Sequence, residues 1–116
     1  MKIGIVGSRK REDKESVFEL VNSLDKDDIV VSGGCKGVDN WAVRRARERG
    51  LKTIVFKPDL QNIKHHGDMV QRYYDRNQKV AKEVDILYAF VSEDRSGGTE
   101  NTIMHATRFG KEVVIK

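Results

Sequence analysis

Three glycine-rich segments in this sequence are suited to binding an anion. They span residues 7–9 (GSR), 32–37 (SGGCKG) and 96–99 (SGGT). Glycine leaves no side chain between the backbone N–H groups and a ligand. A helix that begins after such a turn adds unpaired N–H groups and a partial positive charge. Each segment alone is a common strand-to-helix turn, but together at one edge of a sheet they would form an anion site.

Polar and charged side chains near these segments extend the candidate site. Ser8 and Arg9 can contact a phosphate through a hydroxyl and a guanidinium group. Arg76 and Asn77 can bind phosphate or sugar while Tyr74 stacks on a base; the alternative is the ordinary polar face of a helix. The residues that we expect to contact a ligand are Gly7, Ser8, Arg9, Ser32, Gly33, Gly34, Gly37, Asp39, Arg76, Asn77, Ser96, Gly97, Gly98, Thr99 and Thr102.

Other residues with reactive side chains allow more than one interpretation. Asp39 either holds a ribose hydroxyl or caps the helix that follows it. Cys35 is the only cysteine; its spacing shows no Cys–His pair, so we interpret it as a bystander rather than a nucleophile. His65 and His66 precede Asp68 but offer no set of three or four converging metal ligands. We therefore expect no metal and no cofactor, and we interpret these histidines as part of a surface loop or of a lid.

The spacing of apolar residues predicts the elements that position these groups. Short apolar runs predict strands, and apolar residues three or four positions apart predict helices. The predicted strands span residues 2–6, 29–31, 52–56, 85–91 and 112–116, and the predicted helices span residues 15–24, 38–49, 68–83 and 99–109. This alternation predicts an α/β fold: a Rossmann-like three-layer sandwich with a five-stranded, mainly parallel sheet.

The predicted sheet brings the glycine-rich segments together. In open parallel sheets, ligands bind at the carboxyl ends of the strands, near the point where the strand order reverses. The fingerprint G-x-G-x-x-G does not follow the first strand, and no Walker G-K-[ST] is present. Ordinary dinucleotide binding and P-loop hydrolysis are therefore disfavoured.

Length and composition indicate one domain over residues 1–116, without a signal peptide or an apolar run long enough to cross a bilayer. A single cysteine fits the reducing cytoplasm. The formal net charge of +4 permits contact with phosphates or nucleic acid. An arginine group on one predicted helix is interpreted as a solvated face; it comprises Arg44, Arg45, Arg47 and Arg49.

Several motifs resemble, in order along the chain, those of the SLOG superfamily and its YspA, cpYpsA-related branch. The matching pieces are GSR at 7–9, SGGCKGVD at 32–39, RYYDRN at 72–77, VDILYAFV at 84–91 and SGGTENTI at 96–103. The resemblance implies a Rossmann-like nucleotide-binding fold. Its relatives bind nucleotides or nucleotide-derived ligands, cleave nucleoside monophosphates in cytokinin activation or, as in the DNA-processing protein, bind single-stranded DNA.

One departure from the superfamily concerns catalysis. The cytokinin-activating relatives carry P-G-G-x-G-T-x-x-E, whereas Thr102 follows Thr99 by three residues here. The catalytic glutamate therefore has no counterpart, and the catalytic residues stay unassigned. The carboxylates near the predicted loops are Asp39, Glu93, Asp94 and Glu100.

These observations lead to one main hypothesis and two alternatives. The main hypothesis is a cytoplasmic nucleotide-binding protein, with phosphate across residues 33–34 and 97–99 and with Arg9 and Arg76 neutralising its charge. The alternatives are cleavage of the N-glycosidic bond of a nucleoside monophosphate and binding of single-stranded nucleic acid. The resemblance also implies a homo-oligomer, with Trp41 either at its interface or in the core.

Overall fold

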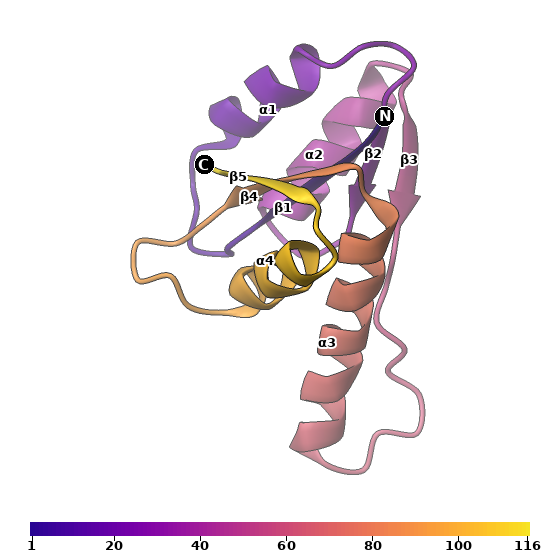
Figure 1. Ribbon diagram of the computed structural model, residues 1–116, viewed down its shortest axis with the longest axis vertical. Coiled ribbons are helices and arrows are strands. Elements are labelled where there is room, and N and C mark those ends of the chain that lie inside the picture. Colours follow the sequence, from indigo (N-terminus) through magenta and orange to yellow (C-terminus); the bar gives the residue numbers. More distant parts are fainter.

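Five strands alternate with four helices along the chain (Figure 1). The computed structural model describes residues 1–116. The elements are β1 (Lys2–Gly7), α1 (Lys14–Asn22), β2 (Ile29–Ser32), α2 (Val38–Glu48), β3 (Lys52–Val55), α3 (His66–Glu83), β4 (Ile86–Phe90), α4 (Gly98–Arg108) and β5 (Glu112–Ile115). None of the helices has the length and apolar character needed to span a bilayer.

The strands form one sheet in the order β3-β2-β1-β4-β5, and every pairing is parallel. The α/β class, the Rossmann-like arrangement and the five-stranded sheet predicted from the sequence are confirmed. The strand order reverses between β1 and β4. The loops that leave the carboxyl ends of these two strands lead to α1 and α4 on opposite faces of the sheet, which opens a crevice between them.

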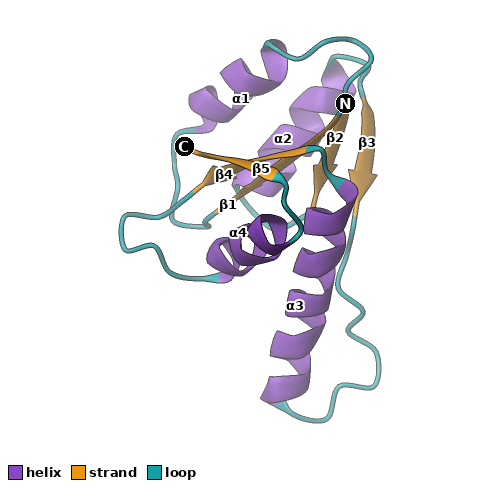
Figure 2. Cartoon of the chain, in the orientation of Figure 1, coloured by secondary structure: helices purple, strands orange, loops and turns teal.

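Helices cover both faces of the sheet (Figure 2). Side chains alternate between the faces along each strand, so β1 sends Ile5 toward α1 and α2 and Val6 toward α3 and α4. Val17 and Val21 of α1 belong to the first core, together with Ile5. Helices α3 and α4 pack against each other and contribute Val80 and Ala106 to the second core. The two faces of the sheet thus carry separate cores, and these cores hold the helices that flank the crevice.

Helix α3 begins two residues earlier than its predicted start at residue 68. His65 is its N-cap residue: its side chain accepts from the backbone of Asp68, and the Asp68 carboxylate accepts from the N–H of His65 at 3.2 Å. This reciprocal arrangement satisfies N–H groups that have no partner within the helix. The role that the structure gives His65 is therefore helix capping, and His66 is the first residue of the helix.

The turn after β1 is fixed by Arg11. Its guanidinium group donates to both carboxylate oxygens of Asp13 at 2.8 and 2.6 Å, and to the carbonyls of Val91 and Lys116, both at 2.9 Å. It also lies 5.3 Å from the centre of the Phe90 ring. One side chain thus ties the entry of α1 to the ends of β4 and β5.

We expect the Asp13→Asn variant to lose part of the acid dependence of stability. The hydrogen bond from Arg11 lowers the pKa of Asp13 from 3.8 to about 2. Because this pKa is depressed in the folded state, its stabilising contribution is present above the unfolded pKa and is lost as the pH falls toward the folded one. The pair is partly exposed, so the variant should lose less than about 1 kcal/mol at neutral pH. Urea unfolding at neutral and acidic pH measures this, and a difference between the two proteins that does not shrink in acid contradicts it.

Candidate functional site

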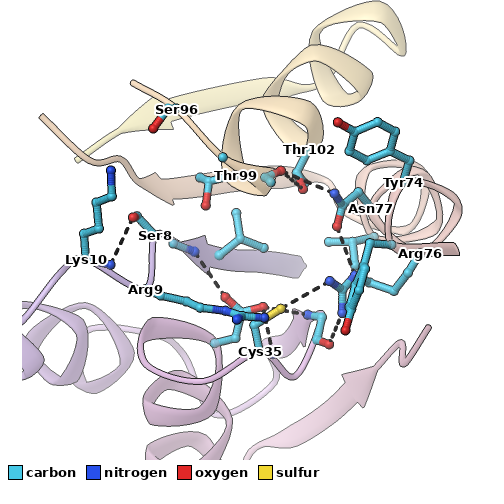
Figure 3. Close-up of a pocket in the computed structure, with 18 of the residues that line it drawn as sticks. Ser8, Arg9, Lys10, Cys35, Tyr74, Arg76, Asn77, Ser96, Thr99 and Thr102 are labelled. Atoms are coloured by element: carbon cyan, nitrogen blue, oxygen red, sulfur yellow. Dashed lines mark hydrogen bonds between the residues drawn. The ribbon is translucent and has the colours of Figure 1, made fainter. Parts of the chain in front are cut away.

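The predicted loops meet around a cavity of about 510 Å³ at the carboxyl ends of β1 and β2 and the amino end of α4 (Figure 3). Most of the residues predicted to bind a ligand line this cavity. They are Gly7, Ser8, Arg9, Gly33, Asp39, Arg76, Asn77, Ser96, Gly97, Gly98, Thr99 and Thr102. Each of the three glycine-rich segments identified in the sequence therefore contributes residues to this cavity.

Ser32, Gly34 and Gly37 were also predicted, but they do not line the cavity. The Ser32 hydroxyl is fully buried and donates to the carbonyl of Ile5 at 2.8 Å, which ties β2 to β1. Gly34 and Gly37 have φ angles of +70° and +87°, a backbone region that favours glycine. These residues shape the loop rather than its open surface.

Asp39 joins the first two loops beneath the cavity. Its buried carboxylate accepts from the backbone N–H groups of Gly7 at 3.1 Å, Gly33 at 3.2 Å and Cys35 at 3.5 Å. Of the two roles expected for Asp39, helix capping is wrong, because the N-cap residue of α2 is Gly37 and no side chain caps that helix. Of the two amides that were expected to hold a phosphate at the second loop, that of Gly33 is thus already occupied by a carboxylate of the chain.

Opposing effects act on the ionisation of Asp39. Burial raises the pKa of its carboxyl group above the usual range, and the nearby Arg76 guanidinium and the amides of Gly7 and Cys35 act in the opposite direction. A buried carboxylate needs such donors, because removing a charge from water is costly. The carboxylate and the guanidinium therefore depend on each other.

Arg76 lies on α3 and links the second loop to α4. Its side chain is buried and donates to the carbonyl of Gly33, to Sγ of Cys35 at 3.2 Å and to Oδ1 of Asn77 at 3.0 Å. The Asn77 amide in turn donates to the carbonyl of Gly98 at 3.3 Å. All three guanidinium nitrogens thus have partners within the chain, so Arg76 positions the cavity wall and adds positive charge to it.

The cationic group that remains open is Arg9, on the first loop. Arg9 is exposed, lines the cavity and has no hydrogen-bond or ion-pair partner in the chain. Lys10 lines the same cavity, and its Nζ lies 2.7 Å from the Asp94 carboxylate. That hydrogen bond, with those from Ser92 and Ser96, holds the pKa of Asp94 well below its usual range. Our sequence analysis missed Lys10, although it directly follows Arg9.

The amino end of α4 provides the open N–H groups of the site. Gly97 is the N-cap residue, with φ +97°, and no side chain caps the helix. No hydrogen bond within the chain reaches the amides of Gly97, Gly98 or Thr99. The Thr102 hydroxyl is directed back into the helix, where it donates to the carbonyl of Gly98 at 3.3 Å. Unpaired amides and the positive end of the helix dipole suit an anion at this position.

Helix α3 forms the wall with the aromatic and apolar side chains. Tyr73, Tyr74, Val70 and Val80 line the cavity there. Tyr74 is 41% exposed, whereas Tyr73 is only partly exposed and lies 5.6 Å from the guanidinium of Arg76. Of these, the sequence analysis named only Tyr74, because helical periodicity assigned the others to the core. Val6 and Cys35 complete the set of lining residues that it missed.

The carboxylates considered for catalysis are not gathered at the cavity. Of those four, only Asp39 lines it, and its oxygens accept from backbone amides. Glu100 forms a two-bond pair with Arg95, at 2.9 Å for each bond. This arrangement holds no free carboxylate that faces the open α4 amides.

Comparisons with known proteins agree with this fold. The model of a family described as "YAcAr: YspA, cpYpsA-related SLOG family" matches residues 1–63. A solved structure titled "X-ray structure of DNA processing protein A (DprA) from Streptococcus pneumoniae" superposes with a TM-score of 0.78 and 20% identity. The match covers 98% of this chain but 49% of that one, so the chain spans about half the length of this neighbour. No curated protein sequence matches the chain.

Proposed function

The chain belongs to the YspA, cpYpsA-related SLOG family, and we propose that it binds a nucleotide or a nucleotide-derived molecule in the cavity between the glycine-rich loops. The observation that carries this proposal is the uncapped amino end of α4, whose free amides share one cavity with Arg9. An anion between them receives backbone donors from one side and a guanidinium group from the other. We expect this binding to occur in the cytoplasm.

In this proposal the phosphate lies at α4 rather than across both glycine-rich loops. The amide of Gly33 already donates to Asp39, and Arg76 is engaged by Gly33 and Cys35. The groups available to phosphate oxygens are the amides of residues 97–99, the Ser8 hydroxyl and the guanidinium group of Arg9.

The nucleoside part then lies along α3. Val70, Tyr73 and Tyr74 give that wall an apolar and aromatic surface, which suits the flat face of a base. Asp39 at the floor keeps unshared electron pairs that can accept from a ribose hydroxyl, the role expected for it from the sequence. We propose no reaction, because no carboxylate stands in for the glutamate of the hydrolytic relatives.

Titration calorimetry with AMP, ADP-ribose and cyclic nucleotides tests this function. For a ligand that binds, we expect Arg9→Ala to weaken binding at least tenfold, because a hydrogen bond to a charged group contributes roughly 1.5–3 kcal/mol and about 1.4 kcal/mol is tenfold in affinity. Arg44→Ala is the matched control, since Arg44 is an exposed arginine on α2 outside the cavity. Absence of binding by every nucleotide to the folded protein, or equal effects of the two variants, would contradict the proposal.

A further inference from the structure

Strand β5 leaves one row of backbone groups unpaired. It is an edge strand and pairs only with β4. The N–H of Lys116 donates to the carbonyl of Ala89 at 2.8 Å, so alternate residues of β5 direct their backbone toward β4. The N–H and C=O groups of Val113 and Ile115 therefore point away from the sheet. A strand edge of this kind is a template for pairing with another chain.

A large apolar side chain is exposed on this edge strand. Ile115 of β5 is 44% exposed. Met104 on α4 and Phe109 just after that helix are also exposed, at 37% and 40%. Helix α4 packs directly against β5. The edge thus combines unpaired backbone groups with apolar side chains that gain from being covered.

The sequence of β5 is complementary to itself in one antiparallel register. We propose that two copies of this chain pair through β5, with Val114 opposite Val114 of the second copy. Val113 then faces Ile115 of the second copy, and since both direct their backbone outward, each such pair exchanges two hydrogen bonds. In the same register Glu112 faces Lys116 of the second copy, on the other face of the sheet. Two opposite-charge pairs therefore flank the two-fold axis.

Neighbouring registers lack this match. A shift of the axis to Val113 pairs Lys111 with Ile115 of the second copy and leaves Glu112 opposite Val114. The other edge strand, β3, is no substitute: pairing centred on Ile54 sets Lys52 against Phe56, without an opposite charge. On β3 the backbone of Thr53 points away from the sheet, and its hydroxyl already accepts from Nε of Arg47 at 3.2 Å. The charges thus select one edge and one register.

A charge-swap series tests this pairing by sedimentation equilibrium, with any tag placed at the amino end. The wild-type chain should associate reversibly as its concentration rises. Glu112→Lys and Lys116→Glu should each weaken association about tenfold, because like charges then face each other twice. The double variant, Glu112→Lys with Lys116→Glu, should restore it. Both residues are exposed, and the contact that Lys116→Glu removes is that of its Nζ with the Tyr88 ring, 5.9 Å from the ring centre.

Two further measurements make the result decisive. Lys52→Glu, an equivalent charge reversal on the other edge, should leave association unchanged. Hydrogen exchange at the amides of Val113 and Ile115 should slow as the wild-type concentration rises. A monomer at every concentration, or single variants that associate like the wild type, or a double variant that is not restored, would overturn the proposal. None of these outcomes depends on nucleotide binding.

Discussion

The Asp39→Ala variant should lose about 3–5 kcal/mol of unfolding free energy, because removing one member of a buried charged cluster leaves the others without partners. The amides of Gly7, Gly33 and Cys35 would each lose an acceptor, and the Arg76 guanidinium would lose the attraction of a nearby negative charge. Asp39 is 4% exposed, so the donors that lose its carboxylate have little access to water. Urea unfolding at neutral pH measures the loss.

Asp94→Ala is the matched control for this prediction. The Asp94 carboxylate also accepts several hydrogen bonds, from Lys10, Ser92 and Ser96, but it is exposed. Water can therefore accept the hydrogen bonds that Lys10, Ser92 and Ser96 lose when this carboxylate is removed. The variant should remain close to wild type in its free energy of unfolding. If both variants lose the same amount, burial is not what makes Asp39 important, and the coupling of the loops through it is wrong.

The fold was predictable because its signals are local. The apolar runs that became β1, β2 and β4 are buried on both faces. Each is separated from the next strand by a helix, and strands connected in this way pair in parallel through right-handed crossovers. The start of α3 was predicted late, because His65 is a weak capping signal. The reciprocal bonds between His65 and Asp68 depend on backbone geometry that residue types alone do not reveal.

The position of the cavity was predictable, but the roles of its residues were not. The sequence shows that Arg76 and Gly33 both belong near the crevice, yet they lie 43 positions apart and their contact depends on how α3 packs. The same holds for Asp39, whose bond to Gly7 spans 32 positions. Residue types predict which kinds of partner a group can bind. The packing of the helices determines which of these partners the group contacts in the folded chain. Arg9 is in an exposed turn, and its side chain has no hydrogen-bond or ion-pair partner in the chain.

Gly7→Ala should destabilise the protein by about 3 kcal/mol, as overpacking does where neither side can move. A Cβ at residue 7 would lie 2.6 Å from Cβ of Val38, which is fixed by the backbone of α2. Val38 is itself fully buried. The added methyl group must therefore push α2 away from β1, and this movement also lengthens the bond from the Gly7 amide to Asp39. Thermal and urea unfolding measure the loss.

Gly98→Ala is the matched control, because Gly98 lines the same cavity with a different environment. A Cβ there would meet only Nδ2 of Asn77, at 3.8 Å, an ordinary contact, and its φ angle lies outside the region that favours glycine. Alanine in the first turn of a helix also restricts the unfolded chain, so this variant should equal or slightly exceed the wild type in stability. Equal losses in both variants would mean that close contact between β1 and α2 does not explain the glycine at residue 7. A loss confined to Gly7→Ala would show that this glycine lets α2 approach the strand closely enough for Asp39 to reach both loops.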